Sequence, residues 1–291
     1  MSRLERQSFL GAESPEVLDR ATVGFVGLGG GGSHSNQQCA HLGIGGYVPA
    51  DPDHIEDTNT NRLVGGTLAD VAAAMPKVDI ATRMIRGLVP NARIIPIHGS
   101  WRSNLPALRS CDVILGSVDT FIEREQLERF ARRSLIPYID VGMDVHDLKE
   151  HGFLVSGQVI LSSPGNPCMR CCGFITDERL KREAERYGAA GSRPQVVWSN
   201  GVLASTAVGL LVQLITPWFP RPPGFAYLEY DGNQSTIVQS VYMRRAASMP
   251  ACPHHPTDEA GDPLFDVHTM MEQPTSMLNA KTPVIRLEAV P

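Results

Sequence analysis

The sequence predicts an α/β protein with a doubly wound, mostly parallel sheet and an antiparallel extension at its C-terminal end. Strand-like and helix-like segments alternate through the first half, a pattern typical of parallel strands in one sheet. A glycine-rich turn joins the first strand to the first helix. After about residue 150 the segments are typical of antiparallel strands and a hairpin. A chain of 291 residues is long enough for about two domains or one large α/β unit.

Two periodicities define the elements of the first 150 residues. Short β-branched or apolar runs predict strands, and apolar residues that recur at i, i+3 and i+4 predict helices. The first strand, the glycine-rich turn, a helix and a second strand follow one another closely enough to form a βαβ unit. The expected elements are a strand at 22–27, a helix ending near 42, a strand at 46–51, a helix at 77–87, strands at 92–97 and 112–116, a helix at 123–134 and a strand at 137–140.

The second half of the chain has a different pattern of apolar and polar residues. Partial alternation at 155–161 predicts an antiparallel strand, and residues 176–187 form a heavily charged, exposed helix or loop. A turn around residues 231–233 joins segments 225–230 and 235–243 into a predicted hairpin. Residues 256–291 alternate proline, acidic residues and methionine without a period, so we interpret them as a tail or partner-docking segment.

Composition and charge exclude several classes of protein. With 42% apolar and 20% charged residues the chain is neither disordered nor a coiled coil. A formal net charge of −5 argues against a nucleic-acid-binding surface. The charged N-terminus lacks the apolar core of a secretory signal, and polar residues interrupt the apolar stretch 196–215. We therefore expect a cytoplasmic enzyme with no membrane partner, in which 196–215 is a buried or dimer-interface helix.

The glycine-rich turn predicts a nucleotide site. Gly27, Gly29 and Gly32 satisfy G-x-G-x-x-G between a strand and a helix, and Asp51 follows Gly32 at the distance expected for a ribose-binding acid. Glycines let the backbone approach phosphates closely, and the helix N-terminus supplies N–H donors. This is a Rossmann-like arrangement. The motif alone is compatible with either NAD or ATP.

Polar residues after the second strand favour a triphosphate. Asn59, Arg62 and Lys77 follow that strand, and Asp119 closes a later one. Two cations would neutralise charge on phosphates, and a carboxylate at a strand end suits Mg²⁺. Taken singly, the two cations also fit surface charges and Asp119 fits a helix N-cap. Their shared order is the stronger signal.

This combination resembles the ubiquitin-activating-type adenylyltransferases of the ThiF/MoeB/HesA family. The resemblance covers about residues 3–255 and rests on the glycine run 27–33, Asp51-x-Asp53, Asn59-x-x-Arg62, Pro76-Lys77 and Val118-Asp119. It implies a homodimer or pseudo-dimer that uses ATP to adenylate the C-terminal carboxylate of a ubiquitin-like or sulfur-carrier protein, releasing pyrophosphate. It also implies one adenylation domain at 1–255, with a nucleotide-binding half at about 20–150 and a zinc-bearing, substrate-facing half at about 151–255.

The resemblance assigns roles to individual residues. Asp51 would bind the ribose, Asn59, Arg62 and Lys77 the phosphates, and Asp119 would hold Mg²⁺. Arg6 stands where the family has an arginine that reaches the other subunit's phosphate site. The residues implied in ATP binding are Gly27, Gly29, Gly30, Gly32, Ser33, Asp51, Asp53, Asn59, Arg62 and Lys77.

The cysteines predict a structural metal site. Cys168 and Cys171 form C-x-x-C, and Cys252 and His255 form C-x-x-H about 80 residues later. Four such ligands suit tetrahedral zinc. Relatives carry C-x-x-C at both positions, so the second pair here becomes Cys252 with His255, or with His254.

A thioester-forming cysteine is harder to identify. No cysteine lies between 173 and 251, and Cys172 is the spare thiol beside the metal pair. It could be a nucleophile, a packing residue, or a ligand in place of Cys171. Cys39 and Cys111 lie in helix and strand patterns and are expected in the core.

Three other functions stay open. An NAD-dependent oxidoreductase could use the same glycine turn but leaves Arg62, Lys77 and the metal ligands unexplained. A non-catalytic nucleotide-binding partner subunit would have no need to retain Arg62, Lys77 and Asp119 together. A relative that adenylates a tRNA or a short peptide is the third, and the acidic charge disfavours the tRNA. The sequence does not name the carrier protein.

Overall fold

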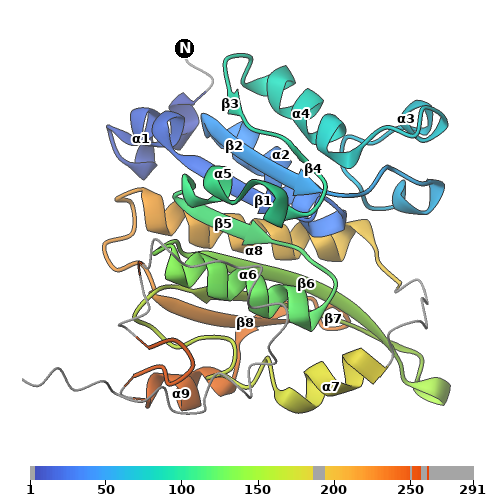
Figure 1. The fold of residues 1–291 in the computed structure, drawn as a ribbon, viewed down its shortest axis with the longest axis vertical. Helices are drawn as coiled ribbons and strands as arrows, with labels where there is room; N and C mark the ends of the chain where they lie inside the picture. The colour runs from blue at the N-terminus through green and yellow to red at the C-terminus, as the bar shows by residue number, and fades with distance from the viewer. Residues whose placement is uncertain (1–3, 186–193, 250, 257–260, 262–291) are drawn as a thin grey trace, which may run out of the picture.

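A computed structural model describes residues 4–185, 194–249, 251–256 and 261. Within them, one nine-stranded sheet runs through both halves of the chain, in the order β3-β2-β1-β5-β6-β7-β8-β9, with β4 also paired to β2 (Figure 1). The strands up to β6 are parallel to their neighbours, and the pairs β6–β7, β7–β8 and β8–β9 are antiparallel. The strands are β1 (Thr22–Val26), β2 (Gly46–Asp51), β3 (Arg93–Ile94), β4 (Ile97–His98), β5 (Val113–Gly116), β6 (Tyr138–Asp147), β7 (Phe153–Ser162), β8 (Phe225–Asp231) and β9 (Thr236–Gln239). The predicted fold class is confirmed.

The single strand predicted at 92–97 is wrong. The structure has two short strands there, and both pair with β2, Arg93 with Gly46 and Ile97 with Ala50. Pro96 lies between them. Because proline has no backbone N–H to donate to the ladder, the pairing stops before it and resumes after it.

Helices cover the sheet on both faces (Figure 1). One face packs against α2 (Gly30–Leu42), α4 (Lys77–Leu88) and α8 (Val197–Ile215), and the other against α5 (Leu105–Arg109) and α6 (Phe121–Arg133). The remaining helices are η1 (Glu5–Leu10), α1 (Ser14–Arg20), η2 (Asp57–Asn59), α3 (Leu68–Ala72), η3 (Trp101–Asn104), η4 (Lys149–His151), α7 (Asp177–Glu185) and α9 (Tyr242–Ala247). Two separate clusters of buried apolar residues fill the spaces above and below the sheet.

Helix α8 accounts for the apolar stretch near residue 200. By length and composition it could cross a membrane, but it packs against α2, β6 and β7, and half of its most apolar window is buried. Leu203 and Leu211 face the core, whereas Trp198 is 60% exposed and Val202 lies on the uncovered side. The helix is therefore a core helix with one open apolar face. The 256–291 tail lies almost entirely outside the described residues.

Candidate functional site

The carboxyl ends of the parallel strands border a pocket of about 910 Å³. Parallel strands end at one edge of a sheet, so segments distant in sequence meet there. Residues from the loops after β1, β2, β4 and β5 line the pocket, together with β6 and the start of α8. The pocket brings together Asp51, Asn59, Arg62, Lys77 and Asp119.

The glycine turn brings the backbone of two strands into close contact. Gly27 has φ +84°, and a Cβ there would lie 2.5 Å from the Ser117 carbonyl oxygen. A Cβ on Gly32 would lie 1.8 Å from the carbonyl oxygen of Gly27, so only glycine lets α2 approach β1 this closely. Gly29 and Gly30 line the pocket, and no atom lies within 4 Å of a Cβ on Gly29. The turn therefore presents bare backbone to a ligand.

Gly32 and Ser33 do not line the pocket, in contrast to the expected nucleotide contact. The buried Ser33 hydroxyl accepts a hydrogen bond from Val64 N at 3.0 Å and donates one to the Gly30 carbonyl at 3.1 Å. These bonds hold the loop after β2 against the glycine turn. Both residues support the turn rather than face the cavity.

Asp51 ties the glycine turn to the end of β2. Its carboxylate accepts hydrogen bonds from Leu28 N at 2.6 Å and from Asp53 N at 2.8 Å. Lys77, the first residue of α4, places Nζ 2.7 Å from Asp53 Oδ2 and 3.9 Å from Asp51 Oδ1. Burial raises the pKa of Asp51, and Lys77 together with the two N–H donors opposes that rise. The result is a fixed carboxylate beside a fixed cation at the end of β2.

Asn59, the last residue of η2, and Arg62, in the turn that follows, both line the pocket. The Asn59 side-chain oxygen accepts a hydrogen bond from Glu56 N at 3.1 Å and closes a capping box around this turn. The Arg62 guanidinium donates to the Thr58 carbonyl at 2.6 Å and to Asn61 Oδ1 at 2.9 Å. Local bonds thus orient an exposed guanidinium at the pocket wall, where phosphate oxygens could replace solvent.

Asp119 is exposed at the end of β5 and lines the pocket. It does not cap α6, because the Thr120 side chain accepts the hydrogen bond from Glu123 N. Glu183 on α7 accepts two more, from Phe121 N at 2.9 Å and Ile122 N at 3.0 Å. The N-cap alternative for Asp119 is therefore wrong, and its carboxylate is directed toward the pocket region. Carboxylate oxygens are suitable Mg²⁺ ligands.

Arg6 is exposed on η1 and is not among the residues that line the pocket. Within one chain it has no part in this site. A role for it depends on a second copy of the chain.

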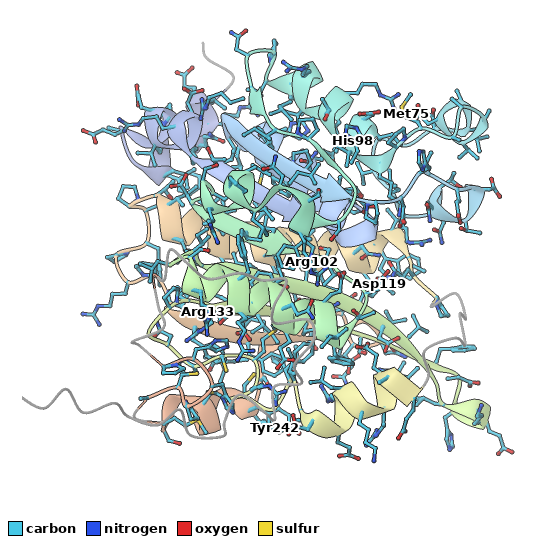
Figure 2. All side chains as sticks on the ribbon, in the orientation of Figure 1. Met75, His98, Arg102, Asp119, Arg133 and Tyr242 are labelled. Carbon is cyan, nitrogen blue, oxygen red and sulfur yellow. The ribbon has the colours of Figure 1, made fainter. Side chains whose placement is uncertain are left out.

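The sequence did not predict two of the arginines that line the pocket. Arg102 lies after β4, with its guanidinium 4.4 Å above the Trp101 ring and 2.8 Å from Glu123 Oε1 (Figure 2). Arg124, in the first turn of α6, is buried and forms an ion pair with the buried Asp140. Arg124 belongs to a charged stretch that is typical of an exposed surface, whereas Arg102 is the single charged residue of segment 99–108. For Arg124, the signal in the sequence was the high charge of α6, whose buried residues include several charged ones.

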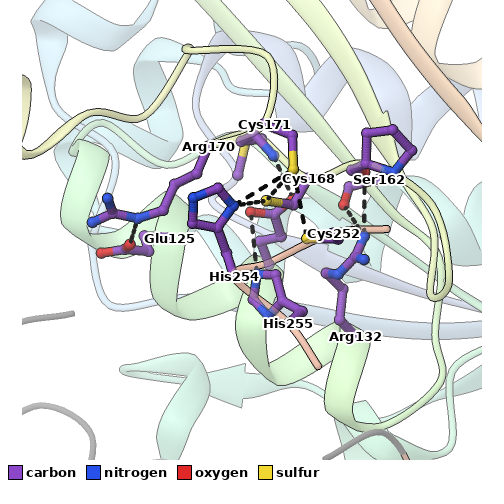
Figure 3. A network of polar contacts seen from close by, with 12 residues as sticks. Glu125, Arg132, Ser162, Cys168, Arg170, Cys171, Cys252, His254 and His255 are labelled. Carbon is purple, nitrogen blue, oxygen red and sulfur yellow. Dashed lines mark hydrogen bonds and ion pairs between the residues drawn. The ribbon is translucent and has the colours of Figure 1, made fainter. Parts of the chain in front are cut away.

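Three cysteines and one histidine converge below α6 (Figure 3). Cys168 Sγ lies 3.7 Å from Cys171 Sγ and 3.5 Å from His254 Nδ1, and Cys171 Sγ lies 3.6 Å from Cys252 Sγ. Tetrahedral zinc, with Zn–S near 2.3 Å and Zn–N near 2.0 Å, requires spacings of about 3.8 Å between sulfurs and about 3.5 Å between sulfur and nitrogen. The donor set and its spacing fit zinc.

The structure brings His254, not His255, to the three thiols. His255 belongs to a second group, with Glu128 and Cys168, whose ligand atoms lie within 4.8 Å of one another. His254 Nδ1 meets the sulfurs, whereas His255 Nε2 lies 3.9 Å from Glu128 Oε2. Burial lowers the pKa of His255 to about 3, and hydrogen bonds to the thiols raise that of His254 to about 9. The fourth donor is thus corrected from His255 to His254, the alternative that the sequence left open.

The other three cysteines are buried in the fold. Cys172 Sγ donates to the Met169 carbonyl at 3.2 Å, and burial raises the pKa of this thiol to about 12. Cys39 and Cys111 lie in the two apolar clusters, as expected, with pKa values also raised to about 12 by burial. None of the three lines the pocket. Cys172 is a packing residue rather than an accessible nucleophile or a member of the metal cluster.

Helix α6 connects the metal cluster to the pocket. Met169 N, between the two cysteines of the first pair, donates to Glu128 Oε1 at 2.9 Å. Arg170 pairs with Glu125, one helical residue after Arg124, and Arg132 donates to the carbonyls of Ser163 and Asn166. A metal ion that orders the 168–171 turn would therefore also support α6, the helix from which Arg124 lines the pocket beside β6.

The pocket defines a nucleotide-binding α/β enzyme, because a bare glycine turn meets several acidic and several basic side chains at the ends of parallel strands. The ThiF family model matches residues 1–253. The chain belongs to the ThiF family. Relatives named adenylyltransferases and activating enzymes make it an ATP-dependent adenylyltransferase by class.

Individual relatives are distant. The SAMP-activating enzyme E1 of Haloferax volcanii is 29% identical over 178 residues, 59% of this chain and 61% of the relative. The sulfur carrier protein adenylyltransferase of Thermus thermophilus is 26% identical over 269 residues, 88% and 92% of the two chains. Among solved structures, E. coli MccB with ATP matches with a TM-score of 0.67 and 21% identity, over 82% of this chain and 71% of that one, which shows a shared fold.

Proposed function

We propose that the chain uses ATP to adenylate the C-terminal carboxylate of a ubiquitin-like or sulfur-carrier protein. One observation carries the proposal: the residues expected to bind ribose, phosphates and Mg²⁺ line the same pocket, although they come from the ends of two different strands, β2 and β5, and the segments that follow them. The names of the relatives support this class of acceptor.

The pocket residues suit the reaction. The substrate carboxylate is already ionised at neutral pH, so it attacks the α-phosphate without a general base. The phosphorus–oxygen bond to pyrophosphate breaks as the bond to the carboxylate forms. The protein contributes alignment and charge stabilisation, for which Arg62 and Lys77 are positioned. Asp119 would hold Mg²⁺, which neutralises charge on the phosphates when it is bound.

A structural zinc ion and a homodimer complete the proposal. Zinc would join the 168–171 turn to the 252–254 segment and would take no part in the chemistry. The exposed apolar side of α8, with Trp198 and Val202, supports a dimer interface, and a second copy would be the only route by which Arg6 enters a pocket. A cytoplasmic location is part of the proposal, and the gathering of three cysteines at a metal-type cluster supports a reducing compartment.

Pyrophosphate exchange tests the activity. Purified chain is mixed with ATP, Mg²⁺, labelled pyrophosphate and each ubiquitin-like protein encoded in the same genome, or with a short peptide. We expect exchange with one donor, and loss of exchange in Arg62→Ala and Asp119→Ala with unchanged circular dichroism. ATP with Mg²⁺ at 100 times its Kd should stabilise the wild type by about 2.7 kcal/mol. Stabilisation by NAD instead of ATP would favour the oxidoreductase alternative.

A further inference from the structure

We propose that Arg124 binds the carboxylate that the enzyme adenylates, and that Asp140 is the positioning residue that orients it. This inference rests on the proposed function and deepens it, because it separates the substrate's end of the pocket from the nucleotide's end. It comes from the order of the strands, the charges that line the pocket and the polar network beneath Arg124.

The order of the strands gives the pocket a direction. Asp51 and Lys77 lie at the end of β2, whereas Gly142 and Met143 line the pocket from β6. Strands β1 and β5 separate β2 from β6, so three strand spacings, about 14 Å, separate the two ends. With ribose at β2 and phosphates over the glycine turn of β1, the open space for a third reactant is on the β6 side.

Arg124 supplies positive charge on that side. The described residues that line the pocket include four cations, of which Arg62 and Lys77 lie on the β2 side. Arg102 is already engaged by Glu123 and stacked on Trp101. In-line transfer requires the attacking oxygen to approach opposite the pyrophosphate that leaves. A carboxylate arriving there meets Arg124, next to Val141 and Gly142 of β6.

A buried network orients the guanidinium. Arg124 Nη1 bonds to Asp140 Oδ2, and the fully buried Asp140 also accepts from Tyr138 Oη at 2.9 Å and Gln158 Nε2 at 3.3 Å. A Cβ on Gly142 would lie 2.8 Å from Arg124 Nη2 and 2.2 Å from Gln158 Nε2, so glycine leaves room for the guanidinium beside the strand.

This arrangement leaves one edge of the guanidinium for a ligand. Nη1 bonds to Asp140, which leaves Nη2 without that partner, and a Cβ on Gly142, a residue of the pocket wall, would lie 2.8 Å from Nη2 and 3.0 Å from Nη1. An arginine can bind two carboxylates through different nitrogens, and its planar fork matches carboxylate geometry. Buried ion pairs contribute little net stability, so a network of this kind at a pocket wall points to a role in binding.

The test compares a carboxylate with its neutral amide. The carrier protein that supports exchange is prepared with its natural C-terminal carboxylate and, by semisynthesis, with a C-terminal carboxamide. Affinities for both are measured in the presence of Mg²⁺ and the non-hydrolysable analogue AMPCPP. Wild type should bind the acid about 10- to 100-fold more tightly than the amide, the factor expected for one hydrogen bond between charged groups.

Substitution of Arg124 should abolish that preference. In Arg124→Gln the acid and the amide should bind alike, with AMPCPP affinity within threefold of wild type, and Arg124→Lys should recover part of the preference. Because Arg124→Gln leaves Asp140 buried without its cation, Arg124→Gln/Asp140→Asn is measured beside it. Asp140→Asn alone, which keeps the cation but frees its orientation, should raise KM more than it lowers kcat.

Arg133→Gln is the matched control, because it removes a positive charge about 14 Å away at the other end of α6 (Figure 2). A preference for the acid retained in the double variant would overturn the proposal. So would a loss of AMPCPP affinity equal to the loss of acid affinity, since Arg124 would then bind the nucleotide. Absence of pyrophosphate exchange in wild type with every donor would instead refute the proposed function.

Discussion

Lys77 Nζ lies 2.7 Å from Asp53 Oδ2, although the two residues begin and end a loop of more than twenty residues. The Lys77 side chain is buried, whereas that of Asp53 is 62% exposed. Lys77 N also donates to the Asp53 carbonyl at 3.0 Å, so backbone and side chain hold the start of α4 against the end of β2. The ammonium is thereby fixed at the end of β2, at the pocket wall, before any nucleotide arrives.

We expect Lys77→Met to lower the rate of pyrophosphate exchange by at least 100-fold, about 2.7 kcal/mol, because it removes a cation fixed in advance near the phosphates. The substitution also leaves the carboxylates of Asp51 and Asp53 without this cation, so that they would repel the phosphates. Steady-state exchange kinetics measure the effect, and a chemical melt checks the fold. Lys181→Met on the exposed face of α7 is the control. Equal rates in Lys77→Met and wild type would remove Lys77 from the site.

The sequence predicted the pocket's motif residues because their positions follow from local order. A strand, a glycine turn and a helix place Gly27 and Gly29, and acids at the ends of successive parallel strands reach the same sheet edge. The same reasoning failed for Arg124 and Asp140. A charged helix indicates an exposed helix unless its packing is known, and the charges on the buried face of α6 meet partners that are distant in sequence, among them Asp140, segment 162–167 and the 168–171 turn.

Two other differences between the predicted and the observed arrangement have local causes. Which of His254 and His255 faces the thiols depends on the backbone direction of a loop without periodicity, so spacing alone could not decide it. Ser33 matched a phosphate-binding pattern. In the structure, Val64 N in the loop after β2 donates a hydrogen bond to the Ser33 hydroxyl. A hydrogen bond of this kind joins segments that are distant in sequence, so local patterns do not predict it.

Asp70 and Arg83 predict a pH-dependent stability. Two hydrogen bonds of 2.7 Å from Arg83, and others from Thr67, hold the pKa of Asp70 well below its ordinary value. A carboxylate whose folded pKa is depressed stabilises the fold above its unfolded pKa near 4, and loses that contribution as pH falls below it. We expect Asp70→Asn to lower the free energy of unfolding by about 1 kcal/mol at pH 7, since Arg83 is half exposed and solvent screens the pair.

Urea unfolding of both proteins between pH 7 and pH 2.5 measures this contribution. The difference between wild type and Asp70→Asn should shrink as the pH falls below about 4, because Asp70 then takes up a proton in the unfolded state while its depressed pKa keeps it ionised in the folded state. A difference that stays constant over this range would mean that Asp70 acts through packing rather than through its charge.

The two histidines provide a matched pair for the metal site. His254→Ala removes a donor from the cluster, whereas His255→Ala leaves all four in place. We expect one zinc ion per chain in wild type and in His255→Ala, and less than half of that in His254→Ala, by elemental analysis after gel filtration. Loss of zinc in His255→Ala alone would reverse the assignment. Absence of zinc from wild type purified without chelators would remove the metal site.

Loss of the metal should also weaken nucleotide binding in the pocket. Met169 N and Arg170 bond to Glu128 and Glu125 on α6, and the same helix carries Arg124. We expect His254→Ala to weaken binding of AMPCPP with Mg²⁺ by a factor of about 3 to 10 while β-sheet content by circular dichroism is retained. Isothermal titration calorimetry measures that affinity. Unchanged affinity in a zinc-free variant would separate the two sites.

The cysteines predict that the acyl-adenylate is not passed to a thiol of this chain. Three of the six cysteines belong to the metal cluster, and Cys39, Cys111 and Cys172 are buried away from the pocket. A sulfur or amine nucleophile from another molecule would therefore attack the acyl carbon and displace AMP. We expect Cys172→Ala to keep the wild-type rate of pyrophosphate exchange, and intact-mass spectra of wild type after reaction with ATP and carrier to show no adduct that dithiothreitol removes. Such an adduct in wild type, absent in Cys172→Ala, would identify Cys172 as a nucleophile that becomes accessible during turnover.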